Sequence, residues 1–362
     1  MTKRNRPEPD AVRRTILGMI YRGQASHLGS SMSMVEILIA AYGFCDIDGI
    51  LNDRPDRDRV FIGNDAVVPP GSEIPTGALI GIKSKPPANN ELSEGDTWFG
   101  SPPIKLPVRQ RFDGGGSNWT YQPPAWKKFM RAAYEAVNIS LPTMLFMTFG
   151  TWAVESFGQK LVDGDYLAVG ELFILDSVLI SLAMTLSVVA VKWITMGRYE
   201  PQVKPMWSFW AMRTEACAVL YWGLAGKVLL EHLRGTPFLP WILRLFGAKF
   251  GKGVFMDMTD ITEFDCVRVG DYCALNAVAA LQTHLYEDRV MKVGRVHLGR
   301  GVAVGAGSTV LYDTFIGDYA RLGPLTVVMK GESIPANSEW VGAPAEPLGA
   351  RGAEAEMARK AG

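Results

Sequence analysis

The sequence predicts a mixed fold, in which segments of left-handed β-helix flank a transmembrane α-helical region after a short α-helical N-terminal segment. Three observations support this prediction: apolar residues spaced six apart near the C-terminus, a shorter run with the same spacing near residue 70, and two long apolar stretches between them. Neither a helix, with a period of 3.6, nor a plain strand, with a period of 2, gives a spacing of six. A triangular coil does, because each of its three short sides takes about six residues.

The C-terminal repeat predicts a hexapeptide-repeat β-helix over residues 247–348. Its inward-facing positions are Leu298, Val304, Val310, Ile316, Leu322, Val328 and Ile334, and the pattern extends back through Val269, Leu275 and Leu281. Small residues follow four positions after the inward ones, at Val302, Ser308, Thr314, Ala320 and Thr326. Glycines come directly after four of the inward-facing residues, at Gly299, Gly305, Gly317 and Gly323. We expect these glycines to turn the corners with a positive φ.

The spacing of apolar residues within 60–110 predicts a partial β-helix of the same kind. Ile62, Val68, Ile74 and Ile80 repeat the spacing of six. This run ends in a Gly-Ser-Pro cap within Trp98–Pro102, and the second run ends in the similar phrase Trp340–Pro344. Such a phrase stops strand addition at the end of a stack. The chain therefore carries an internal duplication, and a polar tail of residues 349–362 follows the second copy.

The apolar composition of residues 125–246 predicts membrane helices, with spans at about 139–157 and 172–191. At ~1.5 Å per residue, each is long enough to cross a hydrocarbon core of about 30 Å. Basic residues precede the first span and follow the second, at Lys127, Lys128, Arg131, Lys192, Arg198 and Lys204. The positive-inside rule then predicts a hairpin with both ends in the cytoplasm. The alternative is a pair of buried helices in a large soluble core.

The apolar segments within 214–246 leave three alternatives open: a re-entrant hairpin, two helices lying on the interface, or two short spans. Each alternative gives an even number of crossings. We therefore expect a multi-pass protein of the bacterial inner membrane, with both solenoids on the cytoplasmic side.

Composition excludes some function classes. The 37 Lys and Arg residues balance 37 Asp and Glu residues, so nothing favours a nucleic-acid partner. The four cysteines, Cys45, Cys217, Cys266 and Cys273, lie scattered with no matching histidine cluster. We therefore expect reduced thiols and no metal site.

Residues 281–289, Leu-Gln-Thr-His-Leu-Tyr-Glu-Asp-Arg, interrupt the hexads and contain the candidate catalytic residue His284. A histidine on a loop between coils is suited to act as a general base, because the imidazole pKa lies near working pH. Glu287 or Asp288 is available to orient it. Backbone N–H groups of neighbouring coils can hold a developing oxyanion. The alternative is a structural histidine that packs the loop.

From about Arg59 to Leu348 the chain resembles the membrane-anchored C-terminal region of nonribosomal peptide synthetase-like proteins of the Pls family. The phrases that carry the resemblance include FIGNDAVVPPGSEIPTGALIGI, GTPFLPWILRLFGAKFGKGVF, LQTHLYEDRVMK and ARLGPLTVVMKGE. The resemblance implies acyl or aminoacyl transfer from a thioester to an amine or hydroxyl, with His284 as the candidate base. It implies acyl-CoA or a carrier-protein phosphopantetheine thioester as donor, and membrane lipid and an adenylation/carrier-domain protein as partners. Hexapeptide solenoids often form trimers, so a homo-oligomer is a further expectation. The alternative is that the two tandem copies replace part of that interface within one chain.

Residues 1–59 are similar to the start of a transketolase N-terminal subunit, through Ala11–Arg22 and the turn Ser26-His27-Leu28-Gly29. In that family the histidine matching His27 contacts thiamine diphosphate or sugar. The chain leaves the family after Arg59 and no Gly-Asp-Gly diphosphate motif follows, so we expect no thiamine diphosphate. The segment is interpreted as a helical cap, a gene fusion or a sequence-assembly join.

Two functions therefore compete. The first is an acyl- or aminoacyl-transferring enzyme built on the C-terminal solenoid. The second is a non-catalytic membrane scaffold or oligomerisation module. A thiamine-dependent transketolase relic is a third and less favoured alternative.

Overall fold

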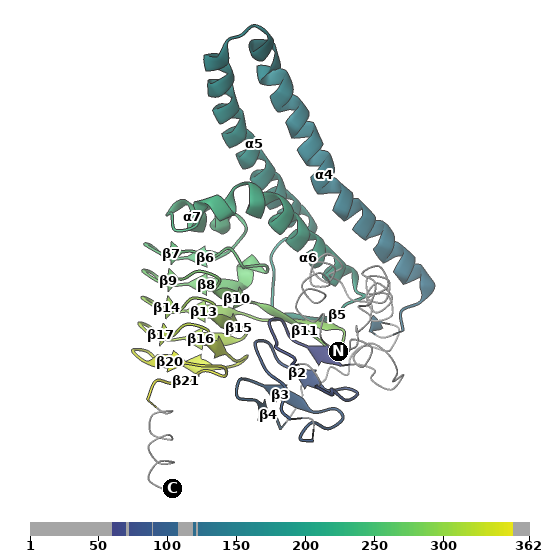
Figure 1. Cartoon of the computed structure of the whole chain (residues 1–362), viewed down its shortest axis with the longest axis vertical. Helices are drawn as coiled ribbons and strands as arrows, with labels where there is room; N and C mark the ends of the chain where they lie inside the picture. The colour runs from purple at the N-terminus through teal and green to yellow at the C-terminus, as the bar shows by residue number, and fades with distance from the viewer. Residues whose placement is uncertain (1–59, 70–71, 89, 108–118, 121, 350–362) are drawn as a thin grey trace, which may run out of the picture. The chain divides into compact units, whose positions relative to one another are not determined.

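The computed structural model describes residues 60–69, 72–88, 90–107, 119–120 and 122–349, and Figure 1 shows its elements. The chain divides into two compact units. Within the described residues, the first holds the chain up to Trp98 together with Pro103–Leu106, and the second holds Phe99–Pro102 and the chain from Pro107 onward. The predicted segments 1–59 and 350–362 lie outside the described residues.

The first unit is a short stack of strands. Its sheet has the order β1 (Phe61–Ile62), β2 (Leu79–Ile80), β3 (Thr97–Phe99) and β4 (Ile104–Lys105). Strands β1, β2 and β3 pair in parallel. Phe61 pairs with Leu79 and Leu79 with Thr97, so each coil takes 18 residues, or three hexads. Ile74 and Ile80 are buried in its small core. Ile62 was expected to point inward but is 48% exposed, because it lies on the outer strand β1.

The second unit contains a β-helix with three sheets along its length, drawn in green and yellow in Figure 1. The first sheet is β6 (Lys249–Phe250), β8 (Val267–Val269), β13 (Val296–Leu298), β16 (Thr314–Ile316) and β19 (Ser333–Ile334). The second is β7 (Phe255–Met256), β9 (Ala274–Leu275), β14 (Ala303–Val304), β17 (Arg321–Leu322), β20 (Glu339–Val341) and β21 (Glu346–Pro347). The third is β10 (Ala280–Gln282), β15 (Thr309–Leu311) and β18 (Val327–Val328). All these neighbours pair in parallel except β20 and β21.

The hexad prediction for this unit is confirmed. All seven predicted inward residues from Leu298 to Ile334 are at most 3% exposed. Val296 pairs with Thr314 and Ala303 with Arg321, which gives the same repeat of 18 residues. Burying one large apolar side chain on each side of every coil removes a continuous column of apolar surface from water, which is the main stabilising term of such a stack.

The expected role of the corner glycines is wrong in its physical reason. Gly299, Gly305, Gly317 and Gly323 do not have a positive φ. A Cβ at Gly305 would come within 2.5 Å of the Gly323 carbonyl carbon, and one at Gly317 within 2.5 Å of the Ala336 nitrogen. The positive φ falls two residues later, where the chain carries Tyr319 (φ 58°) as readily as Gly301 (φ 65°). The glycines after inward residues are needed for close stacking of coils.

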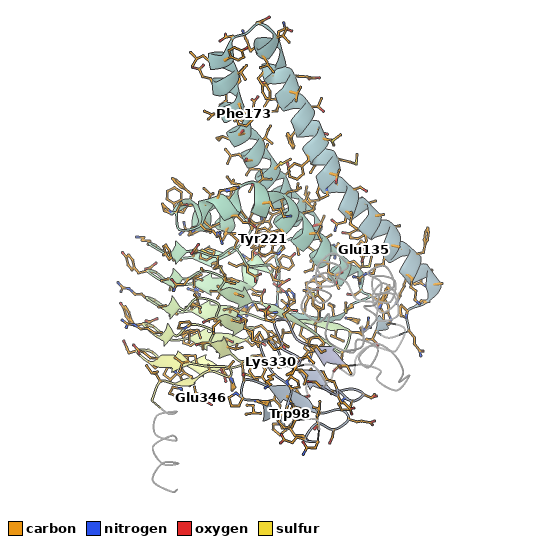
Figure 2. The ribbon with its side chains drawn as sticks, viewed as in Figure 1. Trp98, Glu135, Phe173, Tyr221, Lys330 and Glu346 are labelled. Carbon is orange, nitrogen blue, oxygen red and sulfur yellow. The ribbon has the colours of Figure 1, made fainter. Side chains whose placement is uncertain are left out.

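Two long helices form an antiparallel hairpin within the second unit (Figure 1). Helix α4 (Ala125–Val162) has 38 residues and contains Pro142, and α5 (Tyr166–Thr195) has 30 residues. Helix α4 contains the predicted span 139–157 and α5 contains the predicted span 172–191, and each helix extends beyond its span at both ends. By length and composition they are the two described helices that could cross a membrane, with mean hydropathy of 1.2 and 2.2 over their most apolar stretches. Phe173, which is 59% exposed, projects from α5 in Figure 2.

The segment that follows packs on one end of the β-helix. It comprises α6 (Phe209–Leu220), the π-helix η2 (Tyr221–Gly226), the 3-10 helix η3 (Leu230–Leu233) and α7 (Phe238–Leu245). Tyr221, labelled in Figure 2, is 1% exposed. Its ring packs edge-on against those of Phe246 and Phe264. Leu239 and Leu243 lie in the same apolar core. Helix α7, with 8 residues, is too short to cross a bilayer, which needs ~20 residues.

A hairpin is inserted between two coils of the β-helix. It consists of β11 (His284–Glu287) and β12 (Val290–Val293), and β5 (Gln202–Pro205) adds a third antiparallel strand. Ala280 pairs with Thr309, an offset of 29 residues where the later coils have 18, so the insertion adds eleven residues. Since β5 follows α5 closely along the chain, the strand that carries His284 is joined through β12 to the end of α5.

Candidate active site

The candidate site is centred on a buried carboxylate–imidazole pair. The Nδ1 atom of His284 lies 2.8 Å from Oε2 of Glu263, whose side chain is 0% exposed. His284 opens the inserted strand β11, and Glu263 directly precedes the 3-10 helix η4 (Phe264–Cys266). The two residues are 21 positions apart in sequence, so the coiling of the chain brings them together.

Two threonine hydroxyls complete the surroundings of the Glu263 carboxylate. Thr283 Oγ1 donates to Oε2 at 2.6 Å and Thr262 Oγ1 donates to the same oxygen at 2.8 Å. Burial raises the pKa of Glu263, but the charge of His284 and these hydrogen bonds outweigh that effect and lower it. The Oε1 atom is buried and has no hydrogen-bond partner among the described residues. Glu263 is therefore an ionised carboxylate, and its Oε2 atom is the one that faces His284.

The same pair determines the state of His284. Burial lowers the pKa of His284, but the charge and hydrogen bond of Glu263 outweigh it, so the pKa lies above the ordinary value of 6.5. A carboxylate accepts only, so in neutral His284 the proton is on Nδ1 and the lone pair is on Nε2. No described residue forms a hydrogen bond with Nε2, and the side chain is 20% exposed. The imidazole is thus oriented by one nitrogen and available at the other.

Tyr286 lies beside His284 on the same face of β11. Their ring centroids are 5.1 Å apart with an edge-on geometry. Burial and then the neighbouring Glu215 charge raise the pKa of Tyr286, which keeps it a neutral hydroxyl. Glu215 on α6 forms an ion pair with Arg131 on α4, and Arg131 Nη1 donates to the Met206 carbonyl at 3.0 Å. A polar network therefore connects α4 with the surroundings of His284.

The expected orienting residues have different positions. Glu287 does not contact His284; its Oε2 accepts from Lys292 at 2.6 Å and from Lys330 at 3.1 Å. Burial raises the pKa of Glu287, but the two lysines outweigh it and lower the pKa. Asp288 (φ 52°) and Arg289 (φ 61°) form the two-residue turn between β11 and β12. These acids shape the hairpin, while Glu263 orients the histidine.

Sequence reasoning missed Glu263, although a signal was present. Counting back in sixes from Val269 places Glu263 at the inward-facing position, where every later coil has an apolar residue. A buried carboxylate at such a position is costly unless it is paired and hydrogen-bonded. An acid within the apolar column, one coil before the histidine loop, was therefore the clue.

The remaining candidate residues from the sequence are His27 and the cysteines. His27 lies outside the described residues. Cys217, Cys266 and Cys273 are buried free thiols, and burial raises the pKa of each. Among the described residues, no group of three or more His, Cys, Asp or Glu side chains could hold a metal ion.

The chain is similar in sequence to the delta-poly-L-ornithine synthetase of Acinetobacter baumannii. The two are 41% identical over 291 residues, which is 80% of this chain and 22% of the synthetase. The chain thus spans about a fifth of the length of this relative. No protein-family model matches the chain. The resemblance of residues 1–59 to transketolase finds no support in these comparisons.

The comparison with solved structures finds partial likeness to acetyltransferases. One from Vibrio cholerae, complexed with acetyl coenzyme A, is 16% identical, covers 28% of this chain and 59% of its own, and has a TM-score of 0.26. Galactoside acetyltransferase in complex with coenzyme A is 16% identical over 34% of this chain and 78% of its own, with a TM-score of 0.28. Since these scores are below 0.5, the β-helix assignment rests on the strand pairing described above.

Proposed function

We propose that the C-terminal β-helix transfers an acyl or aminoacyl group from a thioester to an amine, with His284 as general base and Glu263 as the residue that positions it. The observation that carries the proposal is the buried Glu263–His284 pair on the inserted hairpin. A histidine with one nitrogen held by a carboxylate and the other free is the arrangement that general-base catalysis requires.

The proposed reaction follows from this geometry. Nε2 of His284 takes a proton from the acceptor amine while the amine nitrogen forms a bond with the thioester carbonyl carbon. The carbon–sulfur bond then breaks, and the proton held by His284 passes to the leaving sulfur as a thiol. Glu263 stabilises the transient imidazolium, whose charge it already favours. Such positioned proton transfer contributes typically 10²–10⁴-fold to a rate.

An amine acceptor is supported by the relative, whose name describes the synthesis of poly-ornithine. We infer that the donor thioester is carried by coenzyme A or by the phosphopantetheine of a carrier domain. An adenylation and carrier-domain protein, or a corresponding part of a longer chain, would then load the aminoacyl group.

We also infer that α4 and α5 anchor the protein in a bilayer, the bacterial inner membrane, with the β-helix on the cytoplasmic side. Many large apolar side chains of both helices are exposed, among them Ile139, Phe146, Met147, Trp152, Ile174 and Leu186. Soluble proteins rarely expose contiguous apolar surface of this extent. Lipid tails would cover these side chains, and the alternative of two buried core helices does not fit their exposure.

The test is an amide-forming assay with the purified full chain in detergent, an ornithinyl phosphopantetheine thioester as donor and ornithine as acceptor, followed by mass spectrometry. H284A should reduce turnover by about 10²-fold or more. H232A is the matched control, because His232 is an exposed histidine in η3 that contacts neither Glu263 nor His284. Equal turnover by H284A and the unaltered chain would favour the scaffold function.

A further inference from the structure

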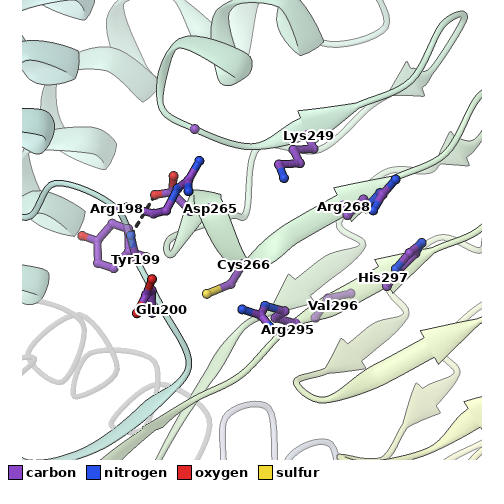
Figure 3. A pocket seen from close by; sticks show the side chains of 11 residues that line it. Arg198, Tyr199, Glu200, Lys249, Asp265, Cys266, Arg268, Arg295, Val296 and His297 are labelled. Carbon is purple, nitrogen blue, oxygen red and sulfur yellow. Dashed lines mark hydrogen bonds between the residues drawn. The ribbon is translucent and has the colours of Figure 1, made fainter.

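A cationic pocket lies on the outer face of the β-helix, close to the ends of α5 and α7. The cavity has a volume of about 340 Å³. Figure 3 shows the side chains that line it. Four of them are basic: Arg198, Lys249, Arg268 and Arg295. None of the four forms an ion pair with a carboxylate among the described residues.

The positive charge is arranged along neighbouring strands. Lys249 on β6 pairs directly with Arg268 on β8, and Arg268 pairs with His297 on β13. Adjacent strands are ~4.8 Å apart, so two like charges stand side by side, which is destabilising in the absence of a counter-charge. A ligand that supplies negative charge would relieve this repulsion.

The acidic residues of the pocket do not neutralise it. Asp265 already has partners: Lys192 Nζ donates to its Oδ2 atom at 2.6 Å, and the Tyr199 backbone N–H donates to the same oxygen at 3.0 Å. Glu200 is exposed and forms no ion pair with the four cations. The pocket therefore has a surplus of basic side chains that are free to contact an anion.

The position of the pocket indicates the source of that anion. Arg198 comes three residues after the end of α5, and Lys249 comes four residues after the end of α7. The outer face of α7 is apolar, with Phe238, Trp241 and Leu245 about half exposed. Trp193 Nε1 donates to the Leu245 carbonyl at 2.7 Å, which ties the ends of the two helices together. Tryptophan and a half-exposed apolar helix face are typical of a membrane interface.

We propose that this pocket binds a phosphate group, and that its source is the headgroup of an anionic phospholipid. The inference rests on the proposed membrane anchoring. Arginine side chains match phosphate oxygens with two parallel hydrogen bonds, and basic pockets at the ends of membrane helices suit phospholipid headgroups. The alternative source of the same chemistry is a phosphate of a soluble thioester donor such as coenzyme A.

The test measures binding to the detergent-solubilised full chain by isothermal titration. The probes are dihexanoyl phosphatidylglycerol, the zwitterionic dihexanoyl phosphatidylcholine, and coenzyme A. The variant R268Q/R295Q removes two of the cations. R300Q is the matched control, because Arg300 is exposed on the same coil and does not line the pocket. Both variants are exposed substitutions, and thermal unfolding checks that they fold.

The proposal predicts that phosphatidylglycerol binds more tightly than phosphatidylcholine. R268Q/R295Q should weaken phosphatidylglycerol binding by about tenfold or more, and R300Q should leave it unchanged. Equal binding of phosphatidylglycerol by the unaltered chain and by R268Q/R295Q would overturn the lipid assignment. Loss of coenzyme A binding alone in R268Q/R295Q would assign the phosphate to the soluble donor instead. H284A should bind phosphatidylglycerol normally, so a failure of this inference is distinguishable from a failure of the proposed transfer.

Discussion

The ammonium group of Lys192 lies 2.6 Å from the carboxylate of Asp265, and both side chains are almost fully buried. Lys192 is in the last turn of α5, and Asp265 is two residues after Glu263. The pair therefore holds the end of an apolar helix against the segment that positions the histidine. This contact gives α5 a structural role in the candidate site.

Breaking this pair should destabilise the protein strongly. K192M leaves the buried Asp265 carboxylate without its cation, and removing one partner of a buried pair typically costs about 3–5 kcal/mol. We expect a clear fall in the midpoint of thermal unfolding in detergent. K252M is the control, because Lys252 is exposed on the same end of the β-helix, and its midpoint should stay unchanged. A K192M midpoint equal to that of K252M would mean that the pair contributes little.

Glu287 should affect stability without affecting the protonation of His284. E287Q removes the charge that pairs with Lys292 and Lys330, and about 3 kcal/mol of stability should be lost near neutral pH. The folded-state pKa of Glu287 is lowered, so its contribution is present above the unfolded value and disappears as pH falls through the folded one.

The measurement is the midpoint of thermal unfolding between pH 3 and pH 7. The difference between E287Q and the unaltered chain should shrink as the solution becomes more acidic. The pH dependence of turnover should be the same in both. A shift of the acidic limb of the turnover profile in E287Q would reinstate Glu287 as the residue that orients His284.

Close coil stacking predicts the cost of a single methyl group. In G317A the new Cβ would lie 2.5 Å from the Ala336 backbone nitrogen, and backbone on both sides leaves no flexible atom to move. Such overpacking costs typically 1–3 kcal/mol. Gly223, in η2, has open space around its Cα, so G223A should be neutral or slightly stabilising. Chemical denaturation of both variants compares them, and an unchanged G317A would show that the coils can separate at no cost.

Much of the fold could be predicted because the hexad repeat is periodic and each inward residue meets the same environment. The inward residues from Leu298 to Ile334 are buried as expected, and the hairpin of β11 and β12 begins within the predicted break at residues 281–289. The repeat does not determine which distant residues meet. Glu263 reaches His284 only because one coil brings residues 21 positions apart together, and Glu287 lies at the far end of β11 from His284.

Other errors arose from the local physical reasoning. Positive φ was assigned to the glycines after inward residues, but the steric limit there is the next coil, and residues such as Tyr319 accept the positive φ. For residues 214–246 the sequence left three alternatives open, and the structure shows that α7 buries Leu239 and Leu243 and exposes Trp241. Length and composition alone do not determine which face of such a short helix packs against the rest of the protein.

The central claim is that Glu263 holds His284 as a general base. It is tested most directly by the pH dependence of kcat/KM for the unaltered chain and for E263Q in the amide-forming assay. The base must be neutral, so kcat/KM should rise with pH through the pKa of His284, which lies above 6.5 in the unaltered chain. E263Q removes the charge that raises this pKa and leaves the opposing effect of burial. In E263Q we expect the acidic limb at lower pH and a reduced plateau, because the imidazolium loses its stabilising partner. An acidic limb at the same pH in both proteins would contradict it.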